Sequence, residues 1–190
     1  MTTAFVLGNG TSRKGIDLLR LKTLGKVYGC NALYRDFSPD VLIATDEGIS
    51  QEIQKSGYAK TNEFYTRKPL TDSGAKKITL NYGFSSGPIA LSYASAISNI
   101  KTIYILGFDY AGVDKKFNNM YADTPHYKKS SETETYYGNW VDQTLTVIKH
   151  HPKVKYFRII PEGALIPDKL RLQENLEHMD LAKFQTIINN

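Results

Sequence analysis

The chain has little cysteine and no long apolar run. Its single cysteine, Cys30, excludes an intrachain disulfide and is typical of proteins from a reducing compartment. No stretch approaches the ~20 consecutive apolar residues of a membrane-spanning helix. The opening residues MTTAFVLGNG also lack the basic start of a signal peptide. We therefore expect a cytoplasmic protein without a transmembrane segment.

Blocks of one charge sign are also missing. The 24 Lys and Arg residues exceed the 19 Asp and Glu residues, giving a net charge of +5, and they occur as scattered pairs such as Arg67-Lys68. A nucleic-acid-binding arm is more often a continuous basic block, so we expect no nucleic-acid partner. The small excess of positive charge is compatible with an anionic small ligand. The four histidines form no HxxxH pair, and one cysteine cannot build a thiolate site, so we expect no metal site.

The sequence does contain short apolar runs that alternate with segments of helical periodicity. Strands are expected at residues 3–7, 26–30, 40–44, 63–66, 102–106 and 154–160. Helices are expected near 16–21, 48–56, 86–97 and 168–188, and after a capping box formed by Ser131 and Glu134. This alternation predicts an α/β, Rossmann-like fold with a mostly parallel sheet and helices on both faces.

No internal repeat, low-complexity tract or linker divides the chain. We expect residues 1–190 to form one domain, because a chain of this size buries roughly 70% of the surface that its unfolded form exposes. Two polar stretches of poor periodicity, 71–85 and 111–129, are expected to be mobile loops. In the helix expected from residue 86, Ser86 would be the cap and Ile89, Tyr93 and Ile97 the buried stripe.

Three motifs fall at the expected ends of strands: Gly8-Asn9-Gly10-Thr11-Ser12, Asp46, and Gly107-Phe108-Asp109. In doubly wound sheets, ligands bind beyond the carboxyl ends of the strands. Glycines let backbone N–H groups approach an anion closely, and a following helix N-terminus adds a favourable dipole. The first motif matches neither the Walker pattern nor GxGxxG. It predicts a nucleotide-binding turn, with a plain tight turn as the alternative.

Other residues are expected to contact a ligand in the same crevice. The amide of Asn31 can pair with a base edge or a ribose, although such a residue is more often part of a turn. Ser86-Gly87 offers a second anion-binding helix N-terminus, or an ordinary cap. Asp46 and Asp109 can bind Mg²⁺ or a ribose, or cap helices.

His126 is the histidine expected nearest to this crevice. An imidazole titrates near neutral pH and can act as a general base. A lone histidine in a loop is more often inert. His178 is expected to be exposed on the C-terminal helix.

In order along residues 3 to about 170, the chain resembles the bacterial lipooligosaccharide sialyltransferases that use CMP-sialic acid. Sequences of this family begin with a strand followed by the motif GNGPS-x-K-x-I-D-x-x-R-L. The next motif is C-N-x-x-Y, with an acidic residue close behind. An S-G pair that opens a helix, the motif G-[IF]-D-[FY] and an H-Y pair then follow in that order. The matching residues are Gly8 to Ser12, Lys14, Ile16, Asp17, Arg20, Leu21, Cys30, Asn31, Tyr34, Asp36, Ser86, Gly87, Gly107 to Tyr110, His126 and Tyr127.

The resemblance implies a CMP-sugar as donor and a carbohydrate as possible acceptor. Asn9 and Asn31 would contact CMP, and Ser86 with Gly87 would lie near the cytidine or sialyl group. Tyr127 would stabilise the leaving phosphate. Transfer would invert the anomeric centre without a metal or cofactor. Family members are often homo-oligomers. The full set of expected binding residues is Gly8, Asn9, Gly10, Thr11, Ser12, Asn31, Asp46, Ser86, Gly87, Asp109 and Tyr110.

The chain also departs from the family pattern. The family's catalytic base is a histidine three residues after the H-Y tyrosine, and Ser130 stands there. Either His126 has taken over as base, with Tyr127, or the protein does not catalyse transfer. A second phosphate-contacting tyrosine is replaced by Ala111, for which Tyr110 or Tyr121 can substitute.

The sequence leaves three functions open. The first is a CMP-sugar-dependent glycosyltransferase. The second is a Mg²⁺-dependent diphosphokinase-like phosphotransferase, because hydroxymethylpterin diphosphokinase-like proteins share the G-N-G-P-S turn. The third is a catalytically inactive nucleotide-binding module.

Overall fold

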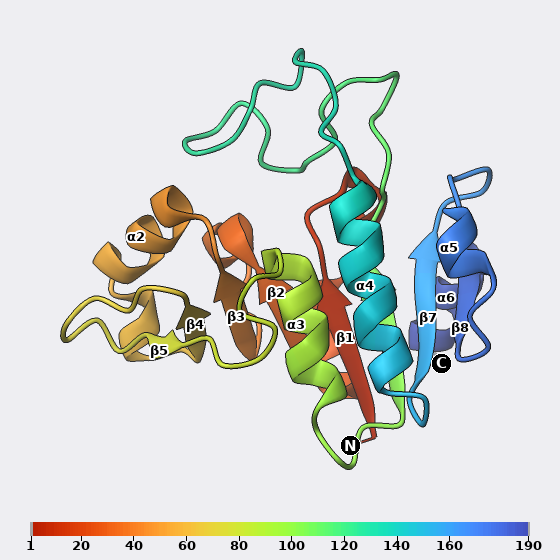
Figure 1. Cartoon of the computed structure of the whole chain (residues 1–190), viewed down its shortest axis with the longest axis horizontal. Helices are drawn as coiled ribbons and strands as arrows, with labels where there is room; N and C mark the ends of the chain where they lie inside the picture. The colour runs from red at the N-terminus through yellow and green to blue at the C-terminus, as the bar shows by residue number, and fades with distance from the viewer. Residues whose placement is uncertain (1, 190) are drawn as a thin grey trace.

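The computed structural model of the chain describes residues 2–189. Eight strands form one sheet in the order β5-β4-β3-β2-β1-β6-β7-β8, and every neighbouring pair is parallel (Figure 1). The strands are β1 (Thr3–Leu7), β2 (Lys26–Cys30), β3 (Val41–Ala44), β4 (Phe64–Thr66), β5 (Lys76–Lys77), β6 (Thr102–Leu106), β7 (Lys155–Ile160) and β8 (Leu176–Asp180). The predicted Rossmann-like fold is confirmed.

Helices cover both faces of this sheet. They are α1 (Leu18–Leu24), α2 (Glu47–Lys55), α3 (Ser86–Ser95), α4 (Gly138–His150), α5 (Asp168–Arg171) and α6 (Leu181–Asn189). Three 3₁₀ turns lie at Thr11–Arg13, Asn31–Arg35 and Tyr58–Lys60. Helices α3 and α4 lie in front of the sheet in Figure 1, whereas the buried residues of α1, α2 and α6 share the core on the other face.

Strand β1 explains this two-layered core. Its side chains alternate between the faces: Ala4 and Val6 join the core under α3 and α4, and Phe5 and Leu7 join the opposite core. β1 pairs with β2 on one side and with β6 on the other. The winding therefore reverses between β1 and β6, and such a switch point is where doubly wound sheets bind ligands.

The C-terminal region differs from the expected single helix over 168–188. It forms α5, then strand β8, then α6. Within β8, Leu176 and Met179 are buried while Glu177 and Asp180 are exposed, and the strand pairs with β7 from Leu176 to Asp180. This long-range pairing outweighs the local helical pattern.

His178 consequently lies in β8 rather than on an exposed helix. Neither of its ring nitrogens has a hydrogen-bond partner among the described residues. Burial and the neighbouring charge of Arg158 lower its pKa to about 4.

The predicted capping box is also wrong. Helix α4 begins at Gly138, well after Ser131. The Glu134 carboxylate instead accepts a hydrogen bond of 2.6 Å from the N–H of Gly112. The irregular segment that starts at Ala111 therefore continues to Tyr137, and in Figure 1 it rises above the carboxyl ends of the strands.

Helix α3 begins one residue away from its expected cap. Ser85 occupies the N-cap, and Ser86 is the first helical residue. Ile89 is buried as predicted, but Ile97 lies beyond the helix and is 42% exposed. In the preceding loop, which was expected to be irregular, Lys76–Lys77 form the short strand β5. No helix within residues 2–189 has the length and apolarity needed to cross a membrane.

Candidate functional site

A cavity of about 190 Å³ opens at the carboxyl ends of β1, β2, β3 and β6, beside the starts of α3 and α4. It therefore occupies the switch point of the sheet. Most of the predicted binding residues line it, whereas Thr11 and Ser12 do not. The lining ones are Gly8, Asn9, Gly10, Asn31, Asp46, Ser86, Gly87, Asp109 and Tyr110.

The turns that follow β1 and β6 approach each other closely at the floor of this site. A Cβ atom on Gly8 would lie 2.5 Å from the carbonyl oxygen of Gly107, and Gly107 itself has a φ of +70°. The N–H of Gly10 donates to that same oxygen at 2.9 Å. These glycines are required by the contact between the two strand ends.

The side chain of Asn9 joins β1 to β2. Its Nδ2 atom donates to the carbonyl oxygen of Cys30 at 3.0 Å, and its Oδ1 atom accepts from Arg13 Nη2 at 3.1 Å. Asn9 thus faces the cavity with its amide group already bound to the protein. Burial raises the pKa of the neighbouring Cys30 thiol to about 12.

Ser86 fixes the start of α3 against two strand ends. Its hydroxyl donates to Asn31 Oδ1 at 2.9 Å and accepts from the N–H of Thr45 at 3.0 Å. No described side chain caps this helix, and its first turn carries no acidic residue. The first N–H groups of α3, at Ser86 and Gly87, have no partner within the helix and are available to an anion in the cavity.

Asp109 is occupied by protein donors. Its carboxylate accepts from the N–H of Ser12 at 3.1 Å, from the Ser12 hydroxyl, and from Asn118 Nδ2 at 2.9 Å. The Oδ1 atom of Asn118 accepts from the N–H of Thr11 at 2.9 Å. Thr11 therefore binds the segment that rises above the sheet, whereas Ser12 binds the turn after β6. Asn118 is a site residue that sequence reasoning missed.

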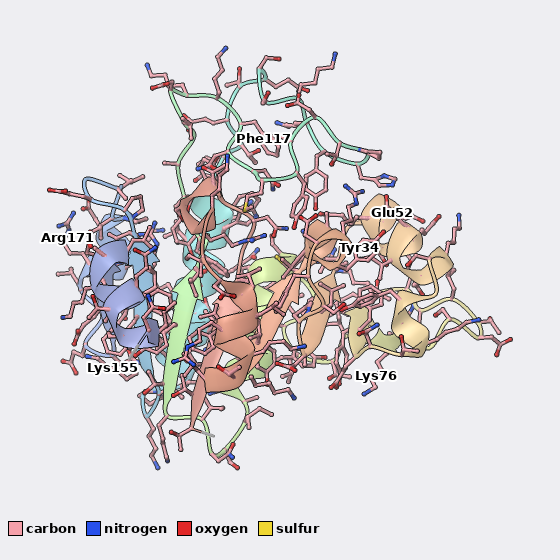
Figure 2. The ribbon with its side chains drawn as sticks, turned by 180° about the vertical axis from the view of Figure 1, so that it is seen from behind. Tyr34, Glu52, Lys76, Phe117, Lys155 and Arg171 are labelled. Carbon is pink, nitrogen blue, oxygen red and sulfur yellow. The ribbon has the colours of Figure 1, made fainter. Side chains whose placement is uncertain are left out.

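Aromatic side chains form one wall of the cavity. Tyr137 and Trp140, from the start of α4, pack with ring centroids 5.3 Å apart, and Phe108 and Phe117 also line the space. Figure 2 shows Phe117 at the base of the segment above the sheet. Nothing in the sequence singled out Phe117. Flat apolar walls of this kind accommodate the face of a ring.

Two buried arginines that the sequence analysis did not identify contact the cavity-lining turns. Arg13 Nε donates to the carbonyl oxygen of Gly8 at 2.6 Å. Arg158 Nε donates to the carbonyl oxygen of Phe108 at 2.8 Å, and its Nη2 atom to that of Asp109 at 2.9 Å. Burial lowers the pKa of Arg158.

The predicted catalytic residues do not line the cavity. His126 is exposed, and its Nε2 atom lies 3.2 Å from Glu52 Oε2 on α2. The Tyr127 hydroxyl accepts from the N–H of Ala32 at 3.1 Å, and burial raises the pKa of this phenol. Ser130 is exposed, with its N–H donating to Asp123 Oδ1 at 3.0 Å.

Candidate metal ligands are sparse. Among residues 2–189, no three His, Cys, Asp or Glu side chains form a group that could hold a metal ion. Asp46, exposed at the N-cap of α2, makes no capping hydrogen bond, whereas Asp109 is bound by Ser12 and Asn118. The residues therefore provide no preformed magnesium site.

No protein-family model, curated protein or solved structure matches the chain.

Proposed function

We propose that the protein binds a nucleotide or nucleotide-sugar in the cavity at the switch point, and that a cytidine nucleotide-sugar is its donor substrate. The observation that carries this proposal is the uncapped start of α3, which opens into the cavity where Ser86 joins Asn31 and Thr45. A helix N-terminus stabilises a phosphate through its free N–H groups and its dipole. The aromatic wall at Tyr137 and Trp140 provides a surface for the base or the sugar.

The choice of cytidine follows from the sequence resemblance to the CMP-sialic-acid-dependent sialyltransferases. The reaction proposed is metal-independent, inverting transfer of the sugar to a carbohydrate acceptor. The residues that line the cavity support binding of the donor, and neither His126 nor Tyr127 is among them.

A thermal-shift panel tests the binding proposal. CMP, CDP, CMP-sialic acid, ATP and GTP are each added with and without Mg²⁺. A ligand present at a hundred times its Kd stabilises the native state by about 2.7 kcal/mol, so we expect a clear rise in Tm with the cytidine compounds. A shift with ATP or GTP but with no cytidine compound would contradict the choice of cytidine.

Asn31→Asp provides the matched variant. The substitution keeps the shape and the acceptor for Ser86, but it replaces the amide NH₂ with a second carboxylate oxygen and adds a negative charge in the cavity. We expect it to abolish the shift. Asn99→Asp, an exposed position before β6, makes the same chemical change outside the cavity and should leave the shift intact.

Turnover assays with the same compounds separate the alternatives for catalysis. CMP release from CMP-sialic acid without Mg²⁺ supports the transferase. If turnover strictly requires Mg²⁺, the phosphotransferase is favoured. Asp46 is then the carboxylate available to bind the ion. Binding without turnover identifies a nucleotide-binding module, and unchanged CMP release by His126→Ala removes His126 as the base.

A further inference from the structure

Two arginine side chains are buried next to the cavity wall without lining it. Arg13 is 4% exposed and Arg158 is 2% exposed. Neither forms an ion pair with a carboxylate among residues 2–189. A buried guanidinium is stable only where other groups replace its lost hydration. The fold therefore has to provide hydrogen-bond acceptors for both guanidinium groups.

Those groups are mainly backbone carbonyl oxygens of the turns that line the cavity. Arg13 holds the oxygen of Gly8, at the end of β1. Arg158 holds the oxygens of Phe108 and Asp109, beyond the end of β6. The planar guanidinium donates along fixed directions, so each arginine sets the orientation of the peptide groups that it binds.

The orientation of a carbonyl fixes that of the next N–H. In a trans peptide the two groups point in opposite directions, and the described residues contain no cis peptide bond. The N–H groups of Asn9, Asp109 and Tyr110 are therefore turned away from the arginines. None of the three donates a hydrogen bond to any group within residues 2–189, although all three residues line the cavity.

Backbone N–H groups without a hydrogen-bond partner are unusual in buried positions. Asn9 is 7% exposed and Tyr110 is 5% exposed, and buried backbone N–H groups nearly always have a partner. Tyr110 also has a φ of 55°, in the left-handed region that a residue with a bulky side chain adopts only where its surroundings hold it. Arg158 provides such support, because its guanidinium lies 4.8 Å from the centre of the Tyr110 ring.

The carboxylate of Asp109, which belongs to the same turn as two of these N–H groups, is already occupied by other donors. The Asp109 carboxylate is bound by Ser12 and Asn118. Successive backbone N–H groups, such as those of Asp109 and Tyr110, can form a concave site for an anion.

We propose that Arg13 and Arg158 are positioning residues that keep the N–H groups of Asn9, Asp109 and Tyr110 available to a phosphate of the ligand. The inference rests on the proposed function, because it assigns a phosphate of the proposed nucleotide. The phosphate of the nucleotide is thereby assigned to these three N–H groups, which leaves the start of α3 for a second anionic group. The cavity therefore fits a ligand with two anionic groups, of which at least one is a phosphate.

An NMR titration of the unmodified protein tests the three N–H groups directly. Inorganic pyrophosphate and CMP are added separately while amide proton shifts are followed. We expect large downfield shifts for Asn9, Asp109 and Tyr110, and smaller ones for Gly8 and Gly10, whose N–H groups already donate to backbone oxygens. Binding of both compounds without these shifts would overturn the inference.

Variants test the two arginines. Lysine retains the charge of arginine but lacks its fixed donor directions. In Arg13→Lys and Arg158→Lys, we expect the preference for CMP over cytidine to fall roughly tenfold or more, while the Kd for cytidine stays the same. A purely structural role would weaken both ligands equally, and that result in a folded variant would overturn the inference.

A matched control accompanies these variants. Arg20 also donates to a backbone oxygen, that of Ile188 at 2.7 Å, but it does not line the cavity or bind its turns. Arg20→Lys should leave the preference for CMP unchanged. If neither buried variant folds, the NMR titration of the unmodified protein decides by itself.

The outcomes separate this inference from the nucleotide proposal. If pyrophosphate shifts the three amides but no nucleotide binds, the nucleotide proposal fails and the inference stands. If CMP binds without shifting them, the nucleotide proposal stands and the inference fails. If neither compound binds, both fail.

Discussion

The Nε2 atom of His126 lies 3.2 Å from Glu52 Oε2, so the histidine expected at the crevice is paired with a carboxylate on α2 instead. Arg35 donates to both oxygens of the same carboxylate, at 2.9 and 2.8 Å. The close approach of His126 to α2 requires Gly48, where a Cβ atom would lie 2.5 Å from His126 Nδ1. Figure 2 places Glu52 and Tyr34 at this corner of the molecule, beside the segment above the sheet. Glu52 therefore anchors that segment to α2.

The Glu52 anchor predicts a pH dependence of stability. Burial acts to raise the pKa of Glu52, but hydrogen bonds from Tyr34 and Arg35 outweigh it, and the pKa is lowered from its ordinary 4.5. A carboxyl whose pKa is lower in the folded state stabilises that state above the unfolded pKa, and this contribution is lost as pH falls through the folded value.

We therefore expect Glu52→Gln to show a smaller loss of stability than the unmodified protein on acidification below pH 4.5. Urea unfolding midpoints at neutral and acidic pH provide the measurement. Glu47→Gln, at an exposed position of α2, is the control and should behave like the unmodified protein. Identical acid sensitivity in Glu52→Gln would show that the anchor contributes nothing to folding.

Gly8→Ala should damage both the fold and the site. The new Cβ would lie 2.5 Å from the oxygen of Gly107, so the ends of β1 and β6 must separate. Overpacking of this kind costs about 1–3 kcal/mol. Differential scanning calorimetry measures the loss. Gly83→Ala is the control, since its Cβ would meet nothing within 4 Å, and it should be neutral or slightly stabilising.

Asn118→Ala should release the segment above the sheet from the turn after β1. The substitution removes the acceptor of the Thr11 N–H and one donor of the Asp109 carboxylate. Leaving such partners unpaired costs about 1–3 kcal/mol. Hydrogen exchange should accelerate between residues 111 and 137 and remain unchanged in β7. Uniform acceleration across the chain would instead indicate global destabilisation.

Cys30 should be unreactive in the native protein. Burial raises the pKa of its thiol to about 12, and the thiolate is the reactive form. We expect iodoacetamide to modify the protein at neutral pH only after urea is added. Mass spectrometry of the alkylated protein measures the extent of modification. Rapid labelling without denaturant would show that the end of β2 opens in the native state.

The sequence alone predicted the centre of the sheet well. The apolar runs that became β1, β2, β3, β6 and β7 are buried on both faces, and that environment leaves a pattern in a local window. The candidate site followed from the same elements, because residues at the ends of neighbouring parallel strands must meet at one edge.

What the sequence did not predict depends on contacts between distant residues. Leu176 to Asp180 became a strand through pairing with β7. Glu134 was expected to cap a helix, yet it binds Gly112. Asn118 and Arg13 look like ordinary loop residues until the fold brings them to Asp109 and Gly8.

The position of β1 has a consequence for synthesis of the protein. β2 is complete at residue 30, but the other neighbour of β1 is complete only at residue 106 of the 190-residue chain. During that interval a nascent chain carries β1 with one open edge, and unpaired strand edges promote association between chains. A fragment that ends before β6 would also lack half of the cavity floor. We therefore expect the region before β6 to need protection by chaperones on the ribosome, and ligand binding to begin only after α4 has emerged.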